Sequence, residues 1–485
     1  METQSISRHL DQNRKILKEA VGLEDSFDLI AKDMEIGRKA AFLFAVNGFV
    51  KDDVLADIMI RLSYVEREQI VPSTLKSILV KYIPHVQAEE VDDMKKLVLM
   101  VLSGGSAIFI EGETSAIVID VKTLPTRAIA EPDLERVVRG SRDGFNETLL
   151  TNVTLVRRRI RDPQLRLVMT KIGSRSETDV CVAYIKDIAD EELVESIQKK
   201  LAKTNVDGIP VADKQLEELI VGKGWNPYPL VRFSERPDVV ATNLLEGNII
   251  IFVDTSPSVM ILPTNFFQLI QHVEEYRQTP LIGSYLRWVR YFGILLSLFL
   301  LPLWFLLVTH PELKPEGLEF IGPHEKAHLP LILQFILAEI GIDLMRMAAV
   351  HTPAPLATAM GLIAAILIGD IAVRTGLWVN EVILYIAIAA IGMFATPSYE
   401  LSLANRMVRL LLLVLVAIFK VPGLVVGTTV ILLILILQRS FNTPYMWPFI
   451  PFNAKALFTV LVRQPFTQMK KRPSINKTLD STRRP

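Results

Sequence analysis

The sequence has only one cysteine, Cys181, among its 485 residues. A disulfide framework within the chain is therefore excluded, and a reducing compartment suits it. Basic and acidic residues balance at 53 each, so the charge gives no argument for nucleic-acid binding. The opening stretch METQSISRHLDQNRKILKEA lacks the apolar core that a signal peptide needs. We therefore expect the N-terminal half to stay on the cytoplasmic side of a membrane.

Catalytic motifs are also scarce. SGGSAIFIEG lacks the lysine and the helix start of a P-loop, and no Ser/His/Asp set or Cys/His pair has an informative spacing. Cys181 lies in the middle of a predicted strand, where we expect a core residue. The sequence thus gives no reason to expect an enzyme or a bound cofactor.

One exception is His324-Glu-Lys-Ala-His328, which matches the H-E-x-x-H pattern of zinc proteases. Prolines 323 and 330 bracket it, and the nearest downstream candidate for a third ligand is Glu339. We interpret the segment as a solvated loop without a metal, and a membrane zinc protease stays as an alternative.

The charged residues, 22% of the chain, are segregated along it. The sequence before residue 291 is mixed and polar, and from there to about residue 437 it is mostly apolar. The predicted fold is an α/β soluble N-terminal half with two tandem subdomains, followed by an all-α transmembrane helical domain. The predicted boundaries are 1–130 and 131–280 for the subdomains, 281–452 for the helical domain and 453–485 for a basic cytoplasmic tail.

The soluble half shows the same pattern twice. Residues 40–46 predict a strand that ends at Asn47-Gly48, residues 52–62 a helix, and residues 103–120 a hairpin that turns at Glu111-Gly112.

Later, residues 166–201 predict strand, turn, strand and an acidic helix start, and residues 244–263 a hairpin that turns at 254–257. The order indicates an internal duplication; the alternative is a chance recurrence of strand, helix and hairpin.

Between the two copies, residues 131–165 contain seven arginines that could bind nucleic acid or anionic headgroups. They are Arg136, Arg139, Arg142, Arg157, Arg158, Arg159 and Arg161. Acidic residues interleave with them throughout. We therefore interpret the cluster as ion-paired or solvated.

The apolar half contains several predicted spans, since ~20 helical residues cross a ~30 Å hydrocarbon core. They are residues 291–308, 329–347, 354–373 and 379–395. Residues 410–437 are too long for one span and are broken at Lys420-Val-Pro-Gly423, so they predict one bent span or a re-entrant pair. The basic tail argues for a cytoplasmic C-terminus and an even number of crossings, which favours the pair.

Charged residues interrupt two of these spans. Glu339 and Asp343 lie one helical turn apart on one face of the second span, Arg346 lies on an adjacent line, and Glu381 opens the fourth span. A charge in lipid is costly unless it is paired or hydrated. An internal ion pair that joins neighbouring helices, a hydrated cation path and an interfacial amphipathic helix all remain open.

The span at 354–373 is the predicted pore helix. Thr358, Leu362, Ala365 and Gly369 share one face, and Asp370 lies beside it near the far end. Small, modestly apolar residues suit a constriction that gates by dewetting, and an acidic ring selects cations. The alternative is a helix packed tightly against its neighbours through small residues.

Three stretches closely resemble the A-subunit family of GerA-type spore germination receptors. They are EPDLERVVRGSRDGFNETLLTNVTLVRRRIRDP, SERPDVVATNLLEGNIIIFVDTSPSVMILPTNF and MGLIAAILIGDIAVRTGL. The resemblance extends from about Asp28 to about Leu437.

The resemblance implies a germination protein of the endospore inner membrane: a homo-oligomeric channel for monovalent cations, embedded in membrane lipid, with its soluble half on the core side. It also implies partners, among them a second membrane subunit and other germination proteins. The alternative function is a non-conducting scaffold or receptor subunit that organises those proteins.

Overall fold

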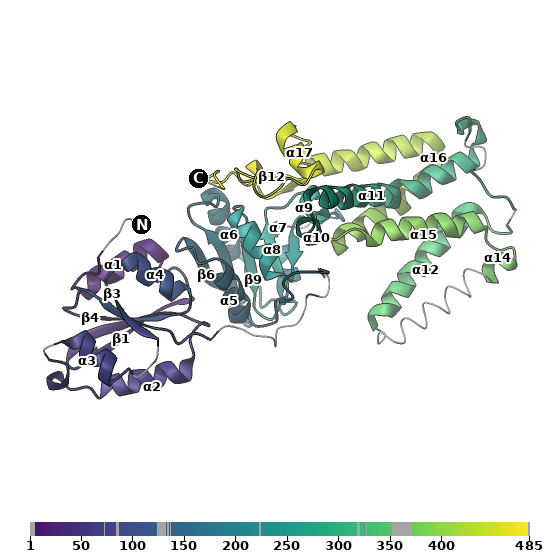
Figure 1. Cartoon of the computed structure of the whole chain (residues 1–485). Helices are drawn as coiled ribbons and strands as arrows, with labels where there is room; N and C mark the ends of the chain where they lie inside the picture. Colours follow the sequence, from purple (N-terminus) through teal and green to yellow (C-terminus); the bar gives the residue numbers. More distant parts are fainter. Residues whose placement is uncertain are drawn as a thin grey trace.

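The computed structural model describes residues 5–71, 73–83, 87–123, 132, 135, 137–222, 225–317, 321–325, 327–351 and 371–483. Figure 1 shows two sheet-containing units followed by a set of long helices, with the C-terminus back beside the second unit. The soluble α/β half and the helical half of the predicted fold are both present.

The first unit is a five-stranded antiparallel sheet in the order β1-β2-β4-β5-β3. Its strands are β1 (Leu29–Ile36), β2 (Lys39–Val46), β3 (Ala88–Val91), β4 (Ser106–Ile110) and β5 (Ala116–Ile119). Its helices are α1 (Leu10–Val21), α2 (Asp52–Ser63), α3 (Thr74–Lys81) and α4 (Met94–Leu102).

The second unit repeats this order as β6-β7-β9-β10-β8, again antiparallel. Its strands are β6 (Leu165–Ile172), β7 (Thr178–Ile185), β8 (Arg232–Ser234), β9 (Ile249–Val253) and β10 (Val259–Leu262). Its helices are α5 (Leu149–Arg159), α6 (Glu191–Lys203), α7 (Ala212–Val221) and α8 (Pro237–Leu245). The predicted internal duplication and both predicted hairpins are confirmed.

Register relates individual residues of the two copies. Phe42 lies opposite Phe109 in the first sheet, and Cys181 lies opposite Phe252 in the second. Cys181 thus takes the place of Phe42 and is fully buried, as predicted for a core residue.

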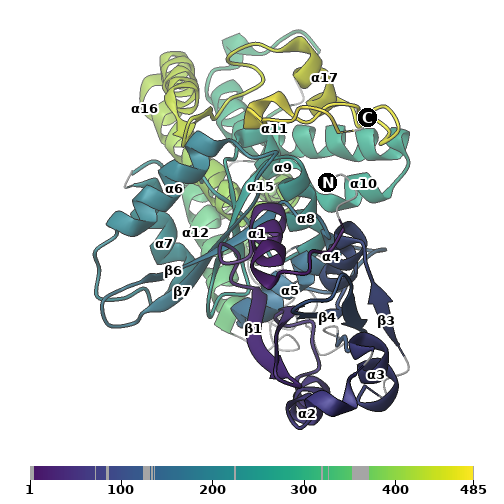
Figure 2. The same ribbon diagram turned by 90° about the vertical axis from the view of Figure 1, so that its left-hand side faces the viewer.

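Helices cover both faces of each sheet. In the first unit α1 and α4 pack on one face and α2 and α3 on the other. Strands covered on both sides need apolar residues at successive positions, which explains the apolar runs at residues 107–110 of β4 and throughout β9. Figure 2 views the molecule from the first unit, with the second unit and the long helices behind it.

A buried ion pair joins the two units. The guanidinium of Arg157 on α5 donates from Nε and Nη2 to the carboxylate of Asp28 at 2.8 and 3.2 Å, and both side chains are 1% exposed. Arg159 pairs with Asp143 at 2.5 Å. For these two arginines the ion-paired interpretation of the cluster is confirmed.

The helical half follows the second sheet. It contains α9 (Phe266–Ile270), α10 (Val273–Arg277), α11 (Pro280–Thr309), α12 (Leu331–His351), α14 (Ala372–Arg374), α15 (Asn380–Phe394), α16 (Tyr399–Leu437) and α17 (Ala454–Leu461). Within the described residues α11 and α16 are long and apolar enough to cross a membrane. They indicate that the chain associates with a membrane.

The helix assigned as α16 reverses direction at Lys420, whose φ of 56° and ψ of −132° are not helical. Both ends lie against the second unit: Glu400 accepts a hydrogen bond from Lys214 at 2.7 Å, and Gln438 accepts one from Asn226 at 2.6 Å. A straight helix of 39 residues would separate its ends by roughly 58 Å. The segment is therefore a helical hairpin, and the predicted break at Lys420-Val-Pro-Gly423 is confirmed.

Close packing holds the hairpin together. A Cβ added to Gly423 would lie 2.1 Å from the carbonyl oxygen of Leu415, and one added to Gly427 would lie 2.8 Å from Cδ2 of Leu412. Each arm has close to the ~20 residues that a bilayer core requires.

Candidate functional site

The candidate site is a cluster of five charged side chains between α12 and the first arm of α16. We call it the charge cluster. Its members are Glu339, Asp343, Arg346, Arg406 and Arg409. Helical spacing brings the three α12 residues onto adjacent lines, and the two arginines lie three positions apart on α16, so the two helices present their charges to each other.

Glu339 lies at the centre of the charge cluster. Its carboxylate is 2.6 Å from Nη2 of Arg409 and 3.0 Å from Nε of Arg406, and all three residues are at most 3% exposed. Arg409 also donates to the backbone carbonyl of Ser297 on α11 at 2.6 Å. The cost of burying these charges is therefore offset by the ion pairs, which join α12 to α16, and the bond to Ser297 links both to α11.

Asp343 differs from Glu339 in its exposure. It pairs with Arg406 and, at 2.9 Å, with Arg346, yet its side chain remains 40% exposed. Arg346 also lies over the ring of Tyr399 at 5.6 Å. Asp343 is therefore the carboxylate of the cluster that an ion or a neighbouring molecule can reach.

The structure brings Glu339, Asp343 and Arg346 together but leaves Glu381 elsewhere. Glu381 lies at the start of α15, where its carboxylate accepts the backbone N–H of His324 at 3.1 Å. The predicted pore residues Thr358, Leu362, Ala365, Gly369 and Asp370 lie outside the described residues.

Sequence reasoning did not single out Arg406 and Arg409. Their signal was two arginines about one helical turn apart in a helix that is otherwise largely apolar, as Glu339 and Asp343 are on α12. It also missed Glu275 on α10, which is fully buried between Arg287, at 2.7 Å, and Arg290 of α11.

The H-E-x-x-H segment is not helical in its described residues. Its two histidines therefore lack the one-turn spacing on which the zinc interpretation depends. His328 instead donates its backbone N–H to the carbonyl of Gly376 at 2.9 Å. Across the parts of the chain that the structure describes, no three His, Cys, Asp or Glu side chains are grouped so as to hold a metal ion.

Comparison with known proteins identifies the family. The model of the Bacillus/Clostridium GerA spore germination protein family matches residues 15–475. The chain belongs to the GerA family. The resemblance read from the sequence is therefore confirmed.

Several curated GerA-family proteins are similar over almost their whole length. Stage V sporulation protein AF of Bacillus subtilis (strain 168) is 49% identical over 99% of this chain and 97% of its own. Spore germination protein KA of the same organism is 31% identical over 96% of this chain and 87% of its own. The stretch that begins HTPAPLATAMGLIAAILIGDIAVRTGL also resembles stage V sporulation protein AF more than a nutrient-receptor subunit, and the higher identity to that protein confirms this.

Among solved structures, the N-terminal domain of the A subunit of the Bacillus megaterium germinant receptor GerK3 is similar. It is 28% identical, with a TM-score of 0.44, and the match covers 55% of this GerA-family chain and 99% of that domain.

Proposed function

We propose that this GerA-family membrane protein is a subunit of a homo-oligomeric channel that releases monovalent cations during spore germination. The observation that carries the proposal is the charge cluster, in which Asp343 stays 40% exposed on a helix of the membrane half. Ionisable residues at membrane depth commonly mark ion pathways. A merely anchoring helix has no need of them.

The geometry divides the roles of the two acidic residues. Glu339 is neutralised by two buried arginines and holds α12 against α16. Asp343 retains access to its surroundings and attracts cations there. The predicted pore helix at 354–373 follows α12 directly in the chain and would supply the constriction.

Oligomerisation is supported by apolar surface on the same helix. Leu337, Ile340, Leu344 and Met347 of α12 are 42–57% exposed within one chain. Copies of the chain around a shared axis would cover this surface, with lipid covering the remainder of the bundle.

The proposed location is the endospore inner membrane, crossed several times, with the soluble half on the core side. Two features support this orientation. Arg287 and Arg290 lie at the end of α11 nearest the second sheet, and the basic C-terminal segment returns to that same end, where Arg483 pairs with Glu246 at 3.3 Å. The α16 hairpin contributes two crossings, which keeps the total even.

Other germination proteins, including a second membrane subunit, are the proposed partners. The relatives named as germination proteins support this part of the proposal. The competing function is a non-conducting scaffold that organises those proteins. The full enclosure of Glu339 favours it, because a purely structural ion pair would look the same.

Cation flux separates the two functions. Potassium release is measured from vesicles that carry the protein, with and without a co-expressed partner subunit. Wild type is compared with Ala365→Phe, in the predicted pore helix, and with Ala387→Phe, a matched change at an exposed position of α15.

A channel gives potassium release that depends on the protein, changes with Ala365→Phe and is unaltered by Ala387→Phe. Absence of release in every arm, including the arm with the partner subunit, would favour the scaffold.

A further inference from the structure

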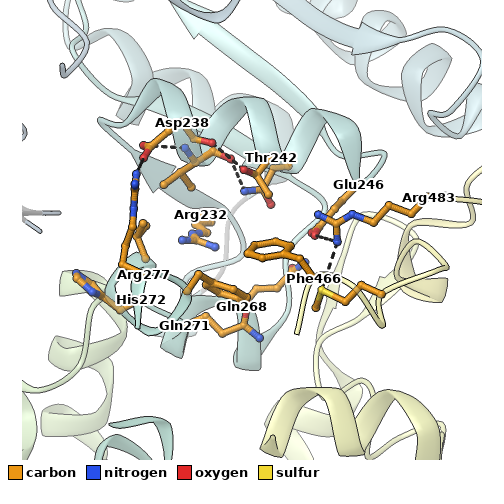
Figure 3. A pocket seen from close by; sticks show the side chains of 15 residues that line it. Arg232, Asp238, Thr242, Glu246, Gln268, Gln271, His272, Arg277, Phe466 and Arg483 are labelled. Atoms are coloured by element: carbon orange, nitrogen blue, oxygen red, sulfur yellow. Dashed lines mark hydrogen bonds and ion pairs between the residues drawn. The ribbon is translucent and has the colours of Figure 1, made fainter. Parts of the chain in front are cut away.

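A pocket of about 310 Å³ lies where the second sheet unit, the start of the helical half and the C-terminal segment meet. Helix α8 forms one wall, α9 and α10 form a second, and residues 466–483 form the third. Figure 3 shows Arg232 and Phe466 between the Asp238–Arg277 pair on one side and the Glu246–Arg483 pair on the other. Nothing in the proposed channel function uses this pocket.

The charged groups that line the pocket carry a surplus of positive charge. Three arginines face two acidic residues. Arg277 donates to Asp238 at 2.7 Å and Arg483 to Glu246 at 3.3 Å, so these four largely neutralise one another. Asp238 is also held by Arg236 through two hydrogen bonds of 2.9 and 3.0 Å.

Arg232 is the remaining cation. Within the described residues its nearest carboxylate is Glu135, at 3.8 Å, which exceeds hydrogen-bonding distance. The side chain of Arg232 is only 13% exposed. The N–H groups of a mostly buried guanidinium without a close acceptor are available to bind a carboxylate or a phosphate.

His272 does not add to this charge. Burial, reinforced by the neighbouring Arg290, lowers the pKa of His272 to about 4, so the ring is neutral at pH 7. Its Nδ1 accepts the backbone N–H of Glu274 at 3.2 Å. Because these roles are structural, the anion-binding capacity of the pocket rests on Arg232.

The remaining lining is largely apolar. Val239, Val273, Met469 and the ring of Phe466 contribute to it. Phe466 is 52% exposed although its ring points into the pocket, so a bound molecule would cover apolar surface there. Pockets of this size that combine a mostly apolar lining with a few convergent polar groups are typical of small-molecule sites.

We infer that this pocket binds a small organic anion, with its carboxylate or phosphate group on Arg232 and its apolar body against Phe466. Such a ligand would touch α8, α10 and the C-terminal segment at once. Helix α10 precedes α11 in the chain, and the buried Glu275–Arg287 pair holds the two helices together. A ligand bound in this pocket would therefore hold the soluble half, the C-terminal segment and helix α11 in contact with one another.

The test uses the full chain in nanodiscs of zwitterionic lipid and calorimetric titration with benzoate. Benzamide, its neutral analogue of similar shape, serves as the ligand control. The variants are Arg232→Gln, which removes the anchoring charge, and Thr242→Trp, which fills the pocket from α8 and keeps Arg232. Arg175→Gln is the matched charge control, since that side chain is 85% exposed on a distant turn.

We expect saturable benzoate binding that is at least roughly tenfold weaker for benzamide and for Arg232→Gln, because a charge-assisted hydrogen bond is lost. Thr242→Trp also weakens binding, and Arg175→Gln does not. Benzoate should slow tryptic cleavage at the exposed Lys470 and Lys471 in wild type and in Arg175→Gln, but not in the two pocket variants. Absence of saturable benzoate binding, or an affinity unchanged in both pocket variants, overturns the inference.

Discussion

Glu339 of α12 and Arg409 of α16 approach to 2.6 Å in the interior of the helical half, where both residues are at most 2% exposed. The contact joins segments that are 70 residues apart in the chain. With Arg406 on the same carboxylate, it fixes the docking of the first arm of α16 on α12. The stability of the helical half should therefore depend on this single acidic residue.

Replacing Glu339 by glutamine should destabilise the protein markedly. The change leaves Arg406 and Arg409 buried with their main counter-charge removed, which typically costs about 3–5 kcal/mol. Thermal unfolding of the detergent-solubilised chain measures the effect. Glu381→Gln is the matched control, because its carboxylate accepts one backbone N–H at an exposed loop and should cost much less. Equal melting temperatures for Glu339→Gln and wild type would contradict the structural role.

The α16 hairpin provides a second stability test. In Gly423→Ala the new Cβ meets the carbonyl of Leu415 at 2.1 Å, so the arms must separate or the backbone must shift. Gly341→Ala on α12 meets nothing within 4 Å and should be neutral or stabilising by up to about 1 kcal/mol. We expect a lower melting temperature for the first variant only. A continuous helix instead of a hairpin would tolerate both changes.

Local patterns made the soluble half predictable from sequence. The hairpin at residues 103–120 is encoded by apolar strands around Glu111-Gly112, where Gly112 adopts a φ of 87°. The break at Lys420-Val-Pro-Gly423 is equally local, since proline and glycine act on their own backbone. Both features are determined by the few residues that form the turn or the break.

The charge cluster could be predicted only in part. The spacing of Glu339 and Asp343 places them on one face, but their arginines come from a helix more than 60 residues later. The docking of the tail was missed for the same reason: Arg463 donates to the carbonyls of Tyr276 and Gln278, at 3.0 and 2.6 Å, although the sequence suggested only a basic tail. The residue spacing within one segment does not say which distant segment it will contact.

Cys181 should be inert in the folded protein. It is fully buried in the second sheet, and burial raises the pKa of its thiol, so the reactive thiolate is scarce at pH 8. Maleimide at pH 8 should leave the native chain unmodified and add one label after denaturation, as read by intact mass. Ser174→Cys, in the turn between β6 and β7, is the positive control and should label in the native state. Rapid labelling of native wild type would show that the second sheet opens.

Asp343 offers the sharpest test of the channel proposal. Neutralising it in Asp343→Asn removes the one exposed carboxylate of the charge cluster, while three arginines stay in place. Glu339 is then the only carboxylate of the cluster facing the three arginines, so a passing cation meets a more positive cluster and the ratio of potassium to chloride permeability should fall. Reversal potentials under a potassium chloride gradient measure that ratio.

Glu381→Gln removes the same charge outside the cluster and should leave the ratio unchanged. Conduction with identical selectivity in Asp343→Asn would place the ion path away from α12, whereas a loss confined to this variant would assign Asp343 to it.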